Sequence, residues 1–306
     1  MSRKISSNSR RSSSRSKQRK RRDSQSPDLA KIGKIAAIVG VPVITLGAGA
    51  YFMTQSMKVE RPDEMGCYNH SDRPVVAIAI DASLSSDLSS EQKRGYNGVF
   101  ERAYAMAPPN ARVDFYTTAR DTNSAIAEPV ASACKPVSTP SENAALGVPD
   151  KPAPYLKKQA EDAHHAFEKL ATEMLSDVQS QDKMALDSPL FEAMQSLSRS
   201  LEFQGRNRAL WWITDGINNS ETARACVVKG DLPPFPVFKT QRRYSYVAPE
   251  SFAGTDVNIM LVEHTRLPHP SAPYCSNFEI REFWQGYFKA NGAENVQLQI
   301  LRHGAE

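Results

Sequence analysis

The most constraining feature of this chain is an apolar run that ends abruptly in polar residues. The run spans Val75–Ile80 and contains only small and branched apolar side chains. It predicts a strand that is buried on both faces of a sheet. The next residues carry oxygen atoms in a D-x-S-x-S spacing, at Asp81, Ser83 and Ser85. Side chains at the carboxyl end of a buried strand line the crevice where open α/β sheets bind ligands, and clustered oxygen atoms suit a hard divalent cation.

Strands and helices are expected to alternate along the rest of the body. Apolar positions at helical spacing predict helices over residues 89–107, 155–178, 189–201 and 279–290. Short apolar runs predict strands over residues 113–118, 126–130, 209–214, 257–262 and 296–301. Pro129 favours a sheet edge for the strand at 126–130, and residues 135–154 are typical of a surface loop. The alternation predicts an α/β fold, a three-layer sandwich in which helices flank a mostly parallel central sheet.

The N-terminal segment is strongly basic. Residues 1–34 contain 12 Lys or Arg and 2 Asp or Glu, whereas the remaining residues contain 26 and 32. High net charge and few apolar residues predict a disordered tail. Its basic cluster at residues 19–22 also fits nucleic-acid binding or a nuclear signal, but the segment that follows argues against nucleic acid as the partner.

Residues 35–53 contain no charged side chain and are about long enough to cross a bilayer core of ~30 Å. The positive-inside rule then places the basic tail in the cytoplasm and the body outside it. We expect a single-pass protein of a bacterial inner membrane, with a periplasmic or extracellular body and a tail suited to anionic lipid. The alternatives are a buried core helix, and a cleaved signal peptide with Ala48-Gly49-Ala50 as its cleavage pattern.

All cysteines lie beyond the apolar segment, at Cys67, Cys134, Cys226 and Cys275. An even number of cysteines in an exported domain predicts two disulfides, with three alternative pairings. Their spacing does not suit a zinc knuckle. With an inverted topology, the same residues would be reduced, buried thiols.

Two later segments also place oxygen ligands at the ends of predicted elements. Ser188-Pro189 is expected to open a helix, and Thr214-Asp215-Gly216 follows a predicted central strand. Together with the first loop they supply two carboxylates and three hydroxyl groups, a set that suits Mg²⁺ or Mn²⁺. Each piece alone is also an ordinary helix cap or turn. Their joint occurrence, in order and on the right elements, favours a metal site.

These segments resemble the metal-ion-dependent adhesion site of the von Willebrand factor A domain family. D-A-S-L-S, S-P-L-F-E-A-M and W-W-I-T-D-G stand in the order of the family's motifs, and the resemblance covers about residues 74–302. It implies that the metal ligands are Asp81, Ser83, Ser85, Ser188 and Asp215. It also implies a central sheet wrapped by helices, and an Mg²⁺ ion (or Mn²⁺ or Ca²⁺) that binds an Asp or Glu of a protein partner.

The chain departs from the family pattern in two places. Ser188 stands where the family usually has Thr, so the methyl group that restricts the rotamer of the side chain is missing. Residues 135–187 exceed a minimal domain, and we expect this insertion to cover or flank the site.

The expected organisation is a basic cytoplasmic tail, a transmembrane helix, a linker and an A-like domain, over residues 1–34, 35–53, 54–73 and 74–302. We expect metal-dependent protein binding rather than catalysis, because neither H-E-x-x-H nor G-x-S-x-G occurs. The alternatives are a structural or assembly factor with a non-functional metal site and an interacting tail, and a metal-dependent hydrolase. His164 and His165 are expected to point about 100° apart on a helix, which is poor for one shared metal.

Overall fold

The computed structural model describes residues 61–69, 73–84, 88–118, 127–179, 188–203, 207–226, 232–263 and 275–302. They belong to one structural unit, which begins at Val59. The predicted basic tail and transmembrane helix, residues 1–34 and 35–53, lie outside the described residues, as does most of the predicted linker. Within the described ranges, no helix combines the length and the apolar character that a membrane span requires.

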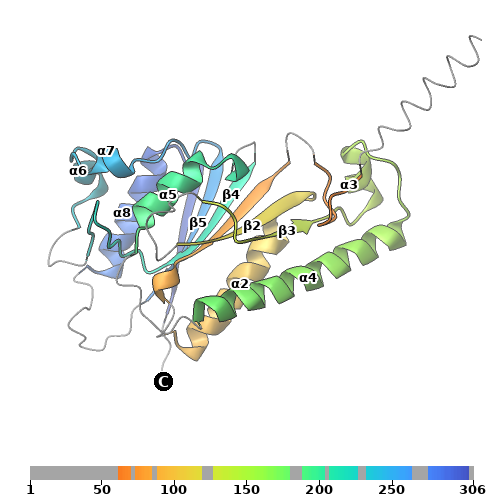
Figure 1. Ribbon diagram of the computed structural model, residues 1–306, viewed down its shortest axis with the longest axis horizontal. Coiled ribbons are helices and arrows are strands. Elements are labelled where there is room, and N and C mark those ends of the chain that lie inside the picture. The colour runs from red at the N-terminus through yellow and green to blue at the C-terminus, as the bar shows by residue number, and fades with distance from the viewer. Residues whose placement is uncertain are drawn as a thin grey trace, which may run out of the picture. The chain divides into compact units, whose positions relative to one another are not determined.

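The described part of the chain contains a six-stranded sheet in the order β3-β2-β1-β4-β5-β6 (Figure 1). The strands are β1 (Val75–Ile80), β2 (Ala111–Thr117), β3 (Ala131–Lys135), β4 (Arg208–Thr214), β5 (Thr255–Val262) and β6 (Asn295–Leu301). Neighbouring strands are parallel except for β2 and β3, which are antiparallel. After β1, the chain adds β2 and β3 on one side of this strand; β4 then pairs with the other side of β1, and β5 and β6 follow beyond β4. The carboxyl ends of β1 and β4 therefore form the topological switch point, where such sheets bind ligands.

Helices cover both faces of this sheet (Figure 1). The helical elements are η1 (Ala82–Leu84), α2 (Ser90–Met106), α3 (Pro140–Ala145), α4 (Ala153–Gln179), α5 (Leu190–Arg199), η3 (Leu201–Phe203), α6 (Phe235–Lys239), α7 (Tyr244–Val247) and α8 (Asn277–Ala290). Ser89 and Ser276 cap α2 and α8, each in a capping box with the residue three positions later. These caps satisfy backbone N–H groups that would otherwise lack partners at the start of each helix.

Alternating side chains of the central strands face two separate cores. Trp211 packs into the core beneath α2 and α4, whereas its neighbour Trp212 packs into the core beneath α5 and α8. All six residues of β1 are buried. A strand that is buried on both faces needs a helix layer on each face. The predicted α/β sandwich with a mostly parallel sheet is thus confirmed.

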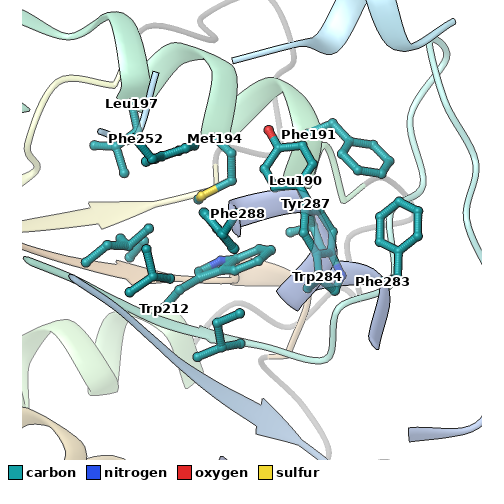
Figure 2. Packing of buried hydrophobic residues seen from close by; sticks show 14 of the residues in the cluster. Leu190, Phe191, Met194, Leu197, Trp212, Phe252, Phe283, Trp284, Tyr287 and Phe288 are labelled. Atoms are coloured by element: carbon teal, nitrogen blue, oxygen red, sulfur yellow. The ribbon is translucent and has the colours of Figure 1, made fainter. Parts of the chain in front are cut away.

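Aromatic side chains dominate the core beneath α5 and α8 (Figure 2). The rings of Trp212 on β4 and Trp284 on α8 meet edge to face, with centroids 4.7 Å apart. The ring centroid of Phe191 on α5 lies 4.9 Å from that of Trp284. Such pairs contribute about 0.5–1.5 kcal/mol each beyond the burial of their area. They hold α5 and α8 against β4, whose carboxyl end carries part of the candidate site.

Two local predictions differ from the structure. The expected strand at 126–130 is absent from the described residues 127–130, and β3 begins instead at Ala131, although its edge position was predicted correctly. Pro129 lacks a backbone donor for the ladder, so pairing as a strand starts after it. The expected loop at 135–154 contains α3, which starts with Pro140 in its first turn and a capping box between Thr139 and Glu142.

The four cysteines form two disulfides, which confirms the predicted number and selects one pairing. Cys67 pairs with Cys134 and Cys226 with Cys275, with Cα atoms 5.8 and 5.3 Å apart. The first disulfide ties the segment before β1 to the edge strand β3. The second ties the loop after β4 to the residue before the cap of α8.

Candidate metal centre

Two carboxylates follow neighbouring strands at the switch point. Asp81 comes directly after β1, and Asp215 directly after β4. These strands pair in parallel with Ile80 opposite Ile213, and the amide of Asp81 donates to the Ile213 carbonyl over 2.9 Å. Because the carboxyl ends of parallel strands meet at one edge of a sheet, both acidic side chains belong to the same crevice.

The Asp81 carboxylate is fully buried and accepts hydrogen bonds from hydroxyl groups in separate parts of the chain. Ser83 Oγ donates to Oδ1 over 2.7 Å, and the Ser83 amide donates to the same oxygen over 3.0 Å. Thr214 Oγ1 donates to Oδ2 over 2.8 Å. Ser188 Oγ lies 3.3 and 3.4 Å from the two oxygens, and Thr118 Oγ1 lies 3.2 Å from Oδ1. Hydroxyl groups from four loops or strand ends thus converge on one carboxylate.

Two effects oppose the ionisation of Asp81. Burial is the larger, and the charge of Asp215 is the second; together they raise the pKa of Asp81 from 3.8 to about 6. Hydrogen bonds from Ser83 and Thr214 act in the opposite direction but only in part. A cation beside the two carboxylates would favour their charged forms. The side chains that could coordinate an ion here offer only carboxylate and hydroxyl oxygen atoms, so this set of candidate ligands fits Mg²⁺ better than a soft metal.

Ser188 is held in place by the loop that follows β4. Its amide donates to the Asn219 carbonyl over 2.7 Å, and the Asn219 amide donates back to the Ser188 carbonyl over 2.9 Å. The buried Asn218 side chain accepts from the Phe191 amide over 3.0 Å and donates to the Ala223 carbonyl over 2.6 Å. The loop after β4 and the start of α5 therefore form one hydrogen-bonded unit, and this unit positions Ser188.

Gly216 fixes the turn that carries Asp215. Its φ of 75° lies in the left-handed region, and a Cβ atom there would come within 2.4 Å of Ile280 Cγ2 on α8. Its carbonyl accepts a hydrogen bond from the Trp284 indole N–H over 2.9 Å, and its amide donates to Thr214 Oγ1 over 2.9 Å. Both the backbone conformation and the close packing require glycine here. Helix α8 thus supports the acidic turn directly.

The described part of the insertion lies beside the site. Helix α4 packs on β3 and α2, and it also contacts η1, the turn that contains Ser83. The described part of segment 135–187 therefore flanks the loop after β1, while its last residues, 180–187, lie outside the described residues.

The structure brings four of the five predicted ligands to the switch point: Asp81, Ser83, Ser188 and Asp215. Ser85 lies outside the described residues. Sequence reasoning did not include the hydroxyls of Thr118 and Thr214 among the ligand residues. Thr214 is the last residue of β4, and Thr118 directly follows β2. Identifying them as site residues requires knowing that β2 and β4 are the neighbours of β1 in the sheet.

No protein-family description matches this chain, and no curated protein sequence matches it. Among solved structures, the chain is similar to the human COPII-coat protein Sec24c, with a TM-score of 0.42 and 11% identity over 76% of this chain and 30% of that one. It is also similar to an aerotolerance-related membrane protein from Bacteroides fragilis, with a TM-score of 0.31 and 14% identity over 74% of this chain and 90% of that one. The chain thus spans less than a third of the Sec24c chain. Similarities this low leave the function to be inferred from the site itself.

Proposed function

We propose that this chain is a membrane-anchored, exported protein whose α/β domain binds a protein partner through a divalent metal ion. The observation that carries the proposal is the convergence of Asp81, Ser83, Ser188 and Asp215 at the switch point of the sheet. Mg²⁺ is the expected ion, with Mn²⁺ or Ca²⁺ as alternatives. The sequence resemblance to the von Willebrand factor A family supports the same function.

Four described residues and Ser85 would hold the ion, with the carboxylates of Asp81 and Asp215 supplying the charge. A bound Mg²⁺ ion would offer an Asp or Glu of the partner a coordination position otherwise filled by water. The chain's own hydroxyl groups keep the Asp81 carboxylate oriented. We propose binding rather than catalysis, because the described residues of this arrangement position a cation and include no recognised nucleophile–base pair.

Export is proposed on two grounds. Residues 35–53 have the length and composition of a membrane span, and the basic residues before them favour the cytoplasmic side. The two disulfides of the body suit an oxidising compartment. The body would then face the periplasm or the extracellular space, with anionic lipid as the contact of the basic tail.

Calorimetric titration of the full-length chain with Mn²⁺ tests the metal site. Asp81→Ala is expected to abolish binding, because it removes the carboxylate on which the donor groups converge. Asp256→Ala is the matched control, since this exposed residue lies near the amino end of β5 and binds Asn295 instead. Equal Mn²⁺ affinity in the Asp81→Ala variant and the control would contradict the site.

A second experiment tests the partner. Proteins that co-purify with the full-length chain, without cross-linking, are compared after lysis of the cells in Mg²⁺ and in chelator, for the native chain and for Asp81→Ala. Metal-dependent recovery that the variant loses supports adhesion through the ion. A chain that lacks residues 1–30 should still recover the partner; loss on this deletion, with no effect of chelator, supports an assembly factor that acts through its tail.

A further inference from the structure

A cluster of metal-ligating side chains lies between α2 and α4, on residues that the proposed adhesion site does not use. Glu101 comes from α2, and His164 and Glu168 come from α4. His164 Nε2 lies 3.0 Å from Glu101 Oε2. One ligand atom from each of the three residues lies within 4.8 Å of the others.

The local structure explains why these side chains meet. His164 and Glu168 are four residues apart on α4, so they share one face of the helix. The His164 ring stacks on Tyr104 of α2, with centroids 5.2 Å apart and planes 15° apart. The stack orients the imidazole so that its Nε2 atom meets Glu101, which lies on α2 like Tyr104. His165 Nδ1 lies 3.0 Å from Glu168 Oε2 and so positions that carboxylate from outside the cluster.

The expectation from the sequence concerned one metal shared by the adjacent residues His164 and His165. Adjacent histidines on a helix were expected to be poor ligands for one shared metal, and in the cluster only His164 is a candidate ligand. The other candidates come from the next turn of α4 and from α2. The packing of α4 on α2 therefore brings together three candidate ligands that the residue spacing within one helix does not predict.

The chemistry of the set differs from that of the crevice at the switch point. One imidazole and two carboxylates suit Zn²⁺, which accepts nitrogen and oxygen ligands, better than Mg²⁺, which prefers oxygen alone. Zinc–ligand bonds of about 2.0–2.1 Å in a tetrahedron place ligand atoms about 3.3 Å apart. The 3.0 Å separation of His164 and Glu101 is close to this value. In the described part of the chain all cysteines are in disulfides, so thiolates do not compete for the ion.

We propose that Glu101, His164 and Glu168 bind a Zn²⁺ ion, with water completing its coordination, and that the ion cross-links α4 to α2. The side chains of these residues are 47%, 40% and 46% exposed, so an ion reaches them without unfolding of the helices. The cross-link would secure the insertion helix, which also contacts the turn η1.

The test is a titration of the full-length chain with Zn²⁺ alone, in excess Mg²⁺ to occupy the switch-point crevice. Calorimetry is expected to show a site whose affinity falls about tenfold or more in His164→Asn and in Glu168→Gln. Glu173→Gln is the matched control, because Glu173 lies on the same helix and pairs only weakly with Lys169, at 3.7 Å. Its Zn²⁺ affinity should equal that of the native chain.

Two further readouts keep the outcome decisive. Zn²⁺ should raise the melting temperature of the native chain and of Asp81→Ala but not of His164→Asn, which separates this site from the adhesion site. Co²⁺ bound in place of Zn²⁺ should give the visible absorption of a tetrahedral ion. Zn²⁺ affinity that is unchanged in His164→Asn would show that the ions bind elsewhere and would overturn the proposal.

Discussion

The hydroxyl group of Thr214, the last residue of β4, donates a hydrogen bond to Oδ2 of Asp81 over 2.8 Å. This contact joins the carboxyl ends of the two strands at which the sheet order reverses. Ser83 donates to the other oxygen, so both oxygens of the buried carboxylate are oriented by hydroxyl groups. Asp215 lies beside them and opposes the ionisation of Asp81. Changes in bound metal, in pH and in the turn that carries Asp215 should therefore all affect the carboxylates of Asp81 and Asp215.

The first prediction concerns Asp81→Asn. The amide keeps the shape of the side chain and removes the charge that Asp215 repels, so the metal-free variant should be at least as stable as the native chain. Mg²⁺ should no longer raise its melting temperature, because one of the two carboxylates is lost. Thermal unfolding with Mg²⁺ and with chelator measures both effects. An Mg²⁺-induced shift equal to that of the native chain would exclude Asp81 as a ligand.

The second prediction concerns pH in the absence of metal. The pKa of Asp81 is about 6 in the folded protein and 3.8 in the reference state, so the folded protein retains a proton that the unfolded chain releases. The contribution of this residue to stability should therefore fall as pH rises from about 4 to about 6. Mg²⁺ affinity should rise over the same interval, because the proton competes with the ion.

Denaturant unfolding at several pH values, with and without Mg²⁺, measures this dependence. Asp81→Asn is its control, because the variant lacks the titrating group and should lose that part of the slope. A native chain whose metal-free stability in this interval has the same slope as the variant would show that Asp81 does not titrate there.

The third prediction concerns Ser188, which is buried and whose Oγ atom lies 3.3 Å from Asp81 Oδ1. Ser188→Thr keeps the hydroxyl and restricts its rotamer, so calorimetry should give an unchanged or higher affinity for Mg²⁺. Ser188→Ala removes the hydroxyl and should weaken binding. If Ser188→Thr loses binding completely while its melting temperature is unchanged, Ser188 does not correspond to the family's Thr.

The fourth prediction compares two glycines with similar, positive φ angles. Gly216 and Gly254 have φ values of 75° and 70°, but an added Cβ atom meets Ile280 at Gly216 and nothing within 4 Å at Gly254. Gly254→Ala should cost about 1–2 kcal/mol for backbone strain. Gly216→Ala should cost about 1–3 kcal/mol more for overpacking, and should also weaken Mg²⁺ binding by displacing the acidic turn. Denaturant unfolding measures the loss of stability, and calorimetry measures the affinity for Mg²⁺. Equal losses of stability in the two variants would show that α8 shifts to accommodate the added Cβ atom at Gly216.

The sequence predicted the elements of the fold well where the pattern was local. β1 was expected at 75–80 and is found there, because a continuous apolar run is sufficient to identify a doubly buried strand. The start of β3 was misplaced and α3, α6 and α7 were missed, since short elements contain too few residues for a period to appear. The prediction of Asp81 and Asp215 as ligands required only that each residue directly follows a strand.

By itself, the sequence thus determined the class of fold, the buried strand and the oxygen-bearing residues that follow it. Tertiary structure alone decided which strands are neighbours, and it added Thr118 and Thr214 to the crevice. It also selected the cysteine pairing and brought Glu101 beside His164 from another helix. The physical reason is that periodicity and spacing report which way a side chain faces along its own element. Contacts between elements depend on strand order and helix packing, which arise when both apolar faces of the sheet are buried at once.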